Sequence, residues 1–396
     1  MNDRIERLKV LSAGILSLVL MLGIARFAYT PMLPLMQQQT GLGLSEGGWL
    51  AAINYLGYFC GAISASLISD LVLKDKLYRI GLIVAVLTTA GMGLTDNVWL
   101  WMALRFLAGL SSAAGMLLGS GLILNWLIRH EHRSELGIHF SGAGLGIALC
   151  AIVIELWHPR FDWSQQWLLL ALLGCLILIP AWRWLPPPDT SAVTRGGGSM
   201  QDKPPSRAFM QLFMAAYFCA GIGYVVSVTF IVAIVDALPG LAGQGGLTFI
   251  VMGLAAAPGC ILMDLLARRI GDLNALTAAF ALQIAGILLP VIEPSLSYTL
   301  LGSVLFGATF VGIVSLVLTM AGRYYPTRPA KMMGKMTLSY GVAQILAPAL
   351  TGLLAESSGS YNDGLYLAAA MMVLGTVLML CLKALDRRER ATLTTN

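Results

Sequence analysis

The chain has 396 residues, of which 57% are hydrophobic and 11% are charged. Its mean hydropathy is +0.78, which indicates lipid as the main solvent and excludes an ordinary soluble protein of two or three domains. The net charge is +5. The six cysteines all lie in apolar segments without CxxC or CxxH spacing, which excludes a disulfide framework and a cysteine metal site.

Twelve segments are long and apolar enough to cross the roughly 30 Å hydrocarbon core, which takes about 20 residues of helix. They extend over residues 10–35, 47–72, 77–95, 98–127, 136–157, 164–185, 208–236, 245–267, 274–293, 296–322, 332–356 and 363–385. A membrane β-barrel would alternate polar and apolar residues, whereas the run at 81–94 is long and unbroken. The sequence therefore predicts an all-α polytopic membrane protein with twelve transmembrane helices.

The distribution of basic residues predicts the orientation, because Lys and Arg near span ends are retained in the cytoplasm. With the N-terminus inside, 22 of the 25 Lys and Arg lie in cytoplasmic segments. Only Arg160 lies outside, and Arg26 and Arg105 lie within spans. We therefore expect both termini in the cytoplasm. The net charge follows from this topology and predicts no nucleic-acid partner.

One long polar stretch, rich in Pro, Gly and Ser, separates six spans from the other six. The predicted domains are an N-terminal six-helix bundle, a cytoplasmic linker and a C-terminal six-helix bundle with a short cytoplasmic tail, at residues 1–185, 186–207 and 208–396. Short matches recur between the halves at offsets of 194 to 198, pairing Asp70 with Asp264 and Arg26 with Tyr224. Such a duplicated unit is typical of secondary transporters.

Three motifs resemble the major facilitator superfamily. They are GIARFAYTPMLPLM at 23–36, the small-xxx-Asp motif with basic residues in the 2/3 loop, and RxxxG at Arg105 and Gly109. The first motif is similar to the bacterial branch called YbfB/YjiJ. Ser66 stands where the 2/3-loop motif usually has Gly, and the GPxxGG pattern of many drug/proton antiporters is missing from span 5. The resemblance implies the major facilitator fold and alternating-access transport in a bacterial inner membrane. We expect a monomer without a cofactor.

Arg26 and Arg105 are the leading substrate-binding candidates. Arg26 precedes Pro34 by eight residues, and Arg105 follows Val98 by seven; at 1.5 Å per residue both lie about 10 to 12 Å deep. The resemblance places both on the cavity wall, and no acidic residue lies mid-span. Two guanidiniums without a counter-ion predict an anionic substrate, since Arg holds carboxylate bidentately.

Structural alternatives stay open for both arginines. Arg105 could bond backbone carbonyls or Tyr hydroxyls, and Arg26 could extend toward the membrane surface. A further alternative is that Asp236 or Glu155 reaches inward and pairs with one of them.

Other polar residues in spans are weaker candidates. Those proposed to line the substrate path are Tyr29, Thr30, Asn54, Tyr58, Tyr224, Ser227, Tyr340 and Gln344. The alternative for each is an interhelical hydrogen bond. His139 and Asp236 are candidates for proton coupling, with a neutral His139 bonded to backbone as the alternative.

Charged residues at the cytoplasmic span ends form a predicted gate. Its members are Asp70, Lys74, Arg79, Glu135, Asp264 and Arg268. The resemblance places Asp70 near the start of span 11, around 332–335, where the positive end of a helix favours a carboxylate. Lys74 or Arg79 could meet Glu135, and Asp264 would mirror this arrangement against span 5. The alternative is a plain surface charge cluster.

These features predict a secondary active transporter of a small organic anion, or of a carboxylate-bearing zwitterion, driven by protons or exchange. The alternative is an efflux pump for amphiphilic drugs, metabolites or lipids. No catalytic constellation, metal-ligand spacing or nucleotide-binding motif occurs in the sequence, so we expect neither an enzyme nor a metalloprotein.

Overall fold

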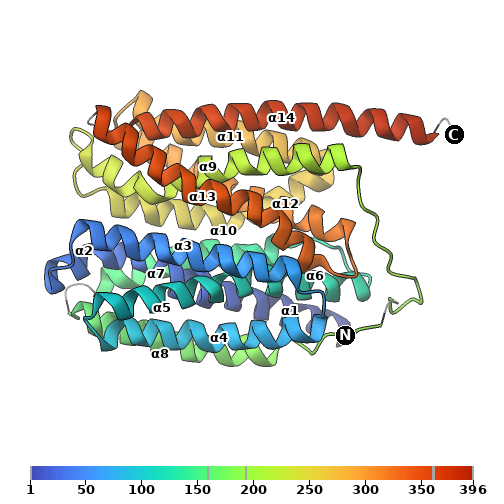
Figure 1. Ribbon diagram of the computed structural model, residues 1–396, viewed down its shortest axis with the longest axis horizontal. Helices are drawn as coiled ribbons and strands as arrows, with labels where there is room; N and C mark the ends of the chain where they lie inside the picture. Colours follow the sequence, from blue (N-terminus) through green and yellow to red (C-terminus); the bar gives the residue numbers. More distant parts are fainter. Residues whose placement is uncertain (1, 158–159, 192–193, 359–361, 395–396) are drawn as a thin grey trace. The chain divides into compact units, whose positions relative to one another are not determined.

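A computed structural model describes residues 2–157, 160–191, 194–358 and 362–394. Long apolar runs fold as helices because a helix satisfies its own backbone groups where no water is present. Figure 1 shows these helices and their labels. The elements are α1 (Asn2–Leu18), η1 (Val19–Phe27), α2 (Tyr29–Thr40), α3 (Leu44–Leu67), α4 (Leu71–Leu94), α5 (Val98–Ala113), η2 (Ala114–Gly119), α6 (Ser120–Arg129), α7 (Gly137–Trp157), α8 (Trp163–Arg183), α9 (Arg207–Ala237), α10 (Gly245–Ile270), α11 (Asp272–Ile292), α12 (Leu296–Tyr324), α13 (Pro329–Ser358) and α14 (Asn362–Thr394).

Some of these elements follow one another along the chain as one rod, and two such rods contain a π-helical segment. The first rod joins α1, η1 and α2, and the fourth joins α5, η2 and α6, so the described elements form twelve rods. Eleven described helices are long and apolar enough to cross a membrane; α13 is the twelfth rod, and several of its side chains lie outside the described residues. The all-α polytopic architecture predicted from the sequence is confirmed.

The chain divides into two compact units, each described by itself. Unit 1 comprises Met1–Asp202 with Ala321–Thr337, and unit 2 comprises Lys203–Met320 with Leu338–Asn396. Unit 1 thus includes the end of α12 and the start of α13. The bundle boundaries at 1–185 and 208–396 stay predictions.

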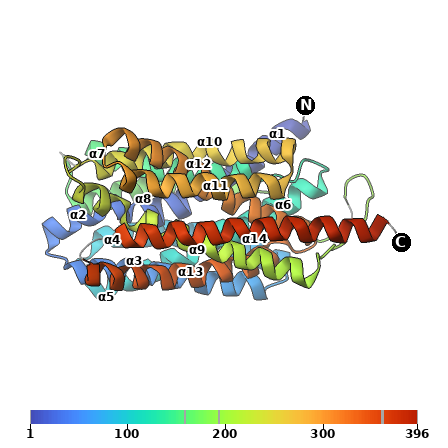
Figure 2. The same ribbon diagram turned by 90° about the horizontal axis from the view of Figure 1, so that it is seen from above.

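In unit 1, α3 and α5 pack backbone to backbone, and Figures 1 and 2 both show them side by side. A Cβ placed on Gly57 would lie 2.1 Å from the carbonyl oxygen of Phe106, and one on Gly109 would lie 2.2 Å from that of Asn54. Small residues allow such close approach between membrane helices. This contact brings the middle of α3 against Arg105.

In unit 2, α9 packs along α14, as both ribbon views show. A Cβ on Gly375 would lie 3.0 Å from the Cβ of Cys219. Aromatic rings form a ladder beside this pair: Tyr217 stacks on Tyr340, with ring centroids 4.6 Å apart, and Tyr340 adjoins Tyr224 at 5.6 Å. The aromatic side chains give this unit an apolar interior.

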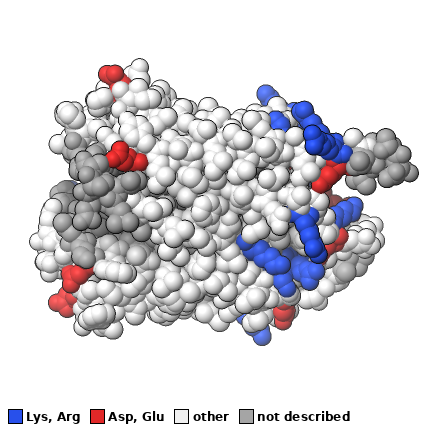
Figure 3. Space-filling model, turned by 45° about the horizontal axis from the view of Figure 1, so that its top comes forward, with Lys and Arg blue, Asp and Glu red and all other residues white. Residues whose placement is uncertain are grey.

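Charged side chains are confined to the helix ends on the face shown in Figure 3, where Lys and Arg gather at one end. The flank of the helices is apolar; Leu87, Leu172 and Leu254 are examples of exposed large hydrophobic side chains. An apolar flank between polar ends matches a bilayer.

Candidate functional site

Arg105 of α5 is buried, with 3% of its surface exposed, and its guanidinium binds backbone carbonyls. Its Nη1 donates to the carbonyl oxygens of Ala25 at 3.2 Å and Arg26 at 3.3 Å, and its Nε donates to that of Leu50 at 3.3 Å. The guanidinium also lies 4.3 Å from the ring centroid of Tyr29. These contacts correspond to the structural alternative considered for Arg105, and they tie α3 and α5 to the first rod.

The irregular backbone of the first rod explains why Arg105 finds free carbonyls there. In η1 the bonds run between residues five apart, as from the Ala28 N–H to the Gly23 carbonyl oxygen at 2.9 Å. Pro31 has no N–H, so position 31 has nothing to donate to the carbonyl of Arg26. Carbonyl groups released in this way need another donor in a membrane interior, and Arg105 supplies it.

Arg26 lies at the end of η1, with 6% of its surface exposed, and aromatic rings surround its guanidinium. The guanidinium carbon lies 4.5 Å from the ring centroid of Tyr58, 4.9 Å from that of Tyr55 and 5.5 Å from that of Phe27. Within the described residues it has no hydrogen-bond or ion-pair partner. Glu155 is exposed on α7 and does not pair with it.

Three further predicted residues of unit 1 surround the two arginines. Asn54 donates from Nδ2 to the carbonyl oxygen of Arg105 at 2.8 Å, and the Tyr29 hydroxyl donates to that of Gly47 at 2.8 Å. Tyr58 is buried, and its ring is one wall of the Arg26 cage, the set of aromatic rings from Phe27, Tyr55 and Tyr58 around the guanidinium. Thr30 is half-buried on α2. The structure thus brings Arg26, Tyr29, Asn54, Tyr58 and Arg105 into one cluster.

Sequence reasoning missed two walls of the cage, Tyr55 and Phe27. Tyr55 stands three residues before Tyr58 on α3, a spacing that places both rings on one helix face. That spacing was the available signal. Phe27 adjoins Arg26 in the chain, and only the π-helical geometry brings its ring near the guanidinium.

The candidates in unit 2 lie on α9 and α13. Tyr224 and Tyr340 are both buried members of the aromatic ladder. Ser227 donates from its hydroxyl to the carbonyl oxygen of Gly223 at 3.1 Å, and Gln344 is buried with 4% of its surface exposed. These four residues share one unit.

Of the two proton-coupling candidates, the structure describes the side chain of His139 but not that of Asp236. His139 is fully buried on α7; its Nε2 lies 2.8 Å from the Ser120 hydroxyl, and its Nδ1 packs against Gly14. The Ser120 hydroxyl also lies 2.6 Å from the carbonyl oxygen of Met116, and because it can donate or accept, its bond to His139 fits either neutral tautomer. The side chain of Asp236 lies outside the described residues.

Gate residues in unit 1 cluster where α3 gives way to α4. Asp70 is the N-cap of α4, and its carboxylate accepts from the Val72 N–H at 2.8 Å. The start of α13 lies close by: Lys331 donates from Nζ to the Ser69 hydroxyl at 2.9 Å, and a Cβ on Gly334 would lie 2.7 Å from the Ser66 nitrogen.

Neither Lys74 nor Arg79 pairs with Glu135 in the described structure. Arg79 bonds Asp75 at 2.9 Å, one turn away on α4, and uses its other nitrogens on the carbonyl oxygens of Trp182 and Leu185. Lys74 is fully buried, and its Nζ has no hydrogen-bond partner in the described part of the chain. Glu135 is half-buried beyond α6. In unit 2, Asp264 is buried on α10 and Arg268 is exposed one turn later.

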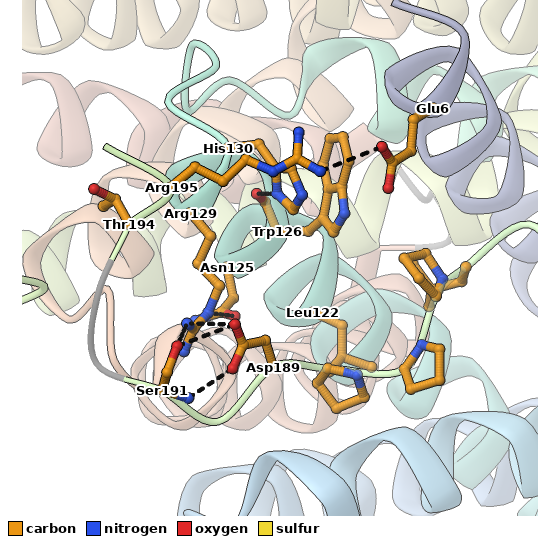
Figure 4. Close-up of a pocket in the computed structure, with 14 residues that line it drawn as sticks. Glu6, Leu122, Asn125, Trp126, Arg129, His130, Asp189, Ser191, Thr194 and Arg195 are labelled. Atoms are coloured by element: carbon orange, nitrogen blue, oxygen red, sulfur yellow. Dashed lines mark hydrogen bonds and ion pairs between the residues drawn. The ribbon is translucent and has the colours of Figure 1, made fainter. Parts of the chain in front are cut away.

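The linker is tied to unit 1 and encloses a cavity of about 390 Å³ beside α6 (Figure 4). Arg129 lies 3.5 Å from Asp189 and donates to the Ser191 hydroxyl at 2.9 Å, while Arg195 lies 3.6 Å from Glu6. A hydrogen bond from the Ser191 N–H, aided by the Ser191 hydroxyl and the Arg129 charge, holds the pKa of Asp189 below its ordinary value. These bonds hold this part of the linker on the helix ends.

Comparisons with known proteins agree with this architecture. The family described as "Uncharacterised MFS-type transporter YbfB" matches residues 18–380. A probable sulfoacetate transporter (SauU) of Cupriavidus necator is 24% identical over 392 residues, covering 89% of this chain and 88% of that protein. The niacin transporter NiaP of Acinetobacter baylyi is 23% identical over 159 residues, covering 40% of this chain and 33% of that protein.

Among solved structures, the human organic anion transporter MFSD10 (TETRAN) is similar with a TM-score of 0.69 and 16% identity, covering 94% of this chain and 99% of that one. This likeness confirms the predicted major facilitator fold, and the transporter relatives confirm the expectation of a transporter rather than an enzyme. The chain is a multi-span membrane protein that moves a small molecule. It belongs to the YbfB-type family of major facilitator transporters.

Proposed function

We propose that the protein is a secondary active transporter of a small organic anion, whose negative group binds at Arg26. The observation that carries this proposal is the surroundings of the Arg26 guanidinium: it lies among aromatic rings and has no charged partner in the described structure, and the residue is 6% exposed. Aromatic faces attract a cation but leave its net charge in place. A carboxylate or sulfonate that reaches this site would meet a guanidinium whose charge is not neutralised, and the low dielectric would strengthen their attraction.

The two arginines take different roles in this proposal. Arg105 donates hydrogen bonds to the carbonyls of Ala25, Arg26 and Leu50, so it positions the backbone of the first rod from which the Arg26 side chain projects. Arg26 then contacts the substrate, with Tyr29, Asn54 and Tyr58 as its support. In unit 2 we propose Tyr224, Ser227, Tyr340 and Gln344 as residues that line the path.

The relatives support an anionic cargo. Their names are those of a probable sulfoacetate transporter and a niacin transporter. Both compounds are organic acids that are ionised at neutral pH. We therefore favour a substrate with one carboxylate or sulfonate and a small body, over the amphiphilic compounds of the efflux alternative.

We further propose transport by alternating access of the two six-helix bundles in a bacterial inner membrane, with both termini in the cytoplasm and energy from protons or exchange. Contacts between the start of α13 and the α3–α4 turn support a cytoplasmic gate that includes Asp70, Lys74 and Arg79. Glu135, Asp264 and Arg268 complete the proposed gate.

Matched acids and neutral analogues test the proposal. Purified protein is titrated with nicotinate and sulfoacetate beside nicotinamide and methylsulfonylacetamide, and the shift in Tm is measured. We expect at least one acid to raise Tm while its neutral analogue does not, and proteoliposomes to take up that acid. Arg26→Gln should abolish both effects, whereas Arg160→Gln, which removes an exposed arginine, should retain them. Equal responses to acids and neutral analogues would favour the efflux alternative.

A further inference from the structure

A small basic pocket lies at the start of α13, within unit 1. It has a volume of about 150 Å³ and is lined by Tyr325, Arg328, Lys331, Met332 and Lys335. Three of these side chains are cationic, and none of the described lining residues is acidic. The volume equals about five water molecules at roughly 30 Å³ each, which is room for a tetrahedral oxyanion.

Lys74 adds a fourth positive charge next to this pocket. Its side chain is fully buried and its Nζ has no hydrogen-bond partner among the described residues. Lys74 stands one turn after Asp70, the N-cap of α4, and the neighbouring Ser69 bonds Lys331 of the pocket. Burying an unpaired ammonium is costly, so a position of this kind favours a negative neighbour.

The acidic groups nearby do not balance these charges. Arg328 lies 3.3 Å from Asp202, and Asp70 is exposed and engaged by the backbone of α4. In the described part of the chain, Lys331 bonds a neutral hydroxyl, that of Ser69. Lys335 is exposed. Among these described groups the four cations therefore outnumber the two carboxylates, Asp70 and Asp202.

We propose that this basic pocket binds a phosphate group at the cytoplasmic surface, carried either by a phospholipid headgroup or by a free phosphate ester. A phosphate offers several acceptor oxygens, which suits one guanidinium fork and several ammonium groups at once. Basic pockets at the cytoplasmic ends of membrane helices are suited to anionic headgroups. This inference is independent of the anion bound at Arg26.

Binding would stabilise the contacts that hold the start of α13 in unit 1. A Cβ on Gly121 would lie 2.4 Å from that of Ala330, so α6 and α13 meet closely there. An anion in the basic pocket would offset the repulsion between Lys74 and the cations of this segment. The phosphate group would therefore strengthen the proposed cytoplasmic gate.

The test uses the full-length protein, delipidated in detergent. One arm titrates glycerol 3-phosphate, a second titrates short-chain phosphatidylglycerol, and a third titrates short-chain phosphatidylcholine, whose headgroup carries no net charge. Tm and direct binding are measured in each. We expect a saturable rise in Tm with phosphatidylglycerol and a smaller rise or none with phosphatidylcholine. A rise with glycerol 3-phosphate as well assigns the site to the phosphate group alone, and a rise with the lipid only assigns it to a headgroup.

Variants then locate the site. Lys335→Gln changes an exposed side chain and should weaken binding roughly tenfold, as expected for loss of one charge-assisted contact. Lys74→Met should raise the Tm of the ligand-free protein and reduce the further rise on binding. Arg269→Gln, which removes an exposed cation of unit 2, should bind as the wild type does. Absence of saturable binding in the first two arms, or wild-type binding by Lys335→Gln, would overturn the proposal.

Discussion

The Arg105 guanidinium donates to the backbone carbonyl oxygen of Arg26 over 3.3 Å, so one buried arginine holds the backbone from which the other projects. Arg105 has saturated much of its donor capacity on carbonyls, whereas Arg26 has only aromatic neighbours in the described structure. Two cations at similar depth therefore differ in what they can offer a ligand. The difference makes their variants distinguishable.

Replacement of Arg26 should affect ligand binding and spare stability. Arg26→Gln removes a charge that no residue of the described chain neutralises, so we expect Tm to change little. Binding of an acid ligand should weaken about tenfold to a hundredfold, the loss of one charge-assisted contact. Arg26→Lys keeps the charge without the fork and should fall between wild type and Arg26→Gln. Isothermal titration with the acid found to bind checks the order, which equal affinities would contradict.

Replacement of Arg105 should affect stability first. Arg105→Gln leaves buried carbonyls of η1 and α3 without a donor, and unsatisfied buried groups cost about 1–3 kcal/mol each. We expect Tm to fall clearly, with binding lost as a consequence. Arg105→Lys, which reaches fewer carbonyls, should also lose stability. A variant with normal Tm and no binding would instead indicate that Arg105 contacts the substrate.

The sequence indicated the helices and the buried cations because hydropathy and charge are properties of single residues. The rods extend past the predicted spans, from 2 to 40 for the first and from 362 to 394 for the last, since helices continue beyond the apolar core. The motif at 23–36, which contains Arg26, lies in the first rod as predicted. The aromatic cage of Arg26 depends on how α3 packs, which no local pattern encodes.

Sequence reasoning could not separate the roles of Arg105 and Arg26. That separation depends on η1, because a π-helix releases carbonyls that an α-helix would bond internally. The segment at 19–27 has no proline or glycine pattern that sets it apart from its α-helical neighbours. For Lys74, the sequence offered Glu135 as a partner of either Lys74 or Arg79, and the burial of Lys74 became visible only in the packed structure.

The close contact between α3 and α5 predicts a glycine requirement. Gly109→Ala places a Cβ 2.2 Å from the carbonyl oxygen of Asn54, a backbone atom that has little freedom to move. Such overpacking costs about 1–3 kcal/mol and should lower Tm. Gly48→Ala, on the same α3 helix with nothing within 4 Å of the new Cβ, is the matched control and should be neutral or slightly stabilising. Equal Tm for the two variants would contradict the close packing.

The linker contacts predict a dependence on pH. The Ser191 N–H bonds Asp189 at 2.8 Å and, with the Ser191 hydroxyl and Arg129, lowers the pKa of this carboxyl below its ordinary value of 3.8. A lowered folded-state pKa means that the ionised carboxylate contributes fully above the ordinary value and is lost as pH falls through the lower one. Hydrogen exchange at the backbone amides of residues 189–191 should therefore accelerate, beyond its intrinsic rate, only below about pH 4.

Asp189→Asn should loosen the same residues at neutral pH. Asp96→Asn, which changes an exposed carboxylate in another loop, serves as the control. Equal protection of the amides of residues 189–191 in Asp189→Asn and wild type would show that Arg129 and Asp189 do not hold the linker.

His139 is expected to act in packing rather than in proton coupling. It is fully buried, its Nε2 is hydrogen-bonded to the Ser120 hydroxyl at 2.8 Å, and its Nδ1 lies against Gly14. A second ring proton would place a positive charge in this fully buried site, which is costly. His139→Gln should lower the stability by about 1–3 kcal/mol and leave the pH profile of transport unchanged. Transport measured against external pH in proteoliposomes checks this. A variant with wild-type Tm and a flat pH profile would instead make His139 the coupling group.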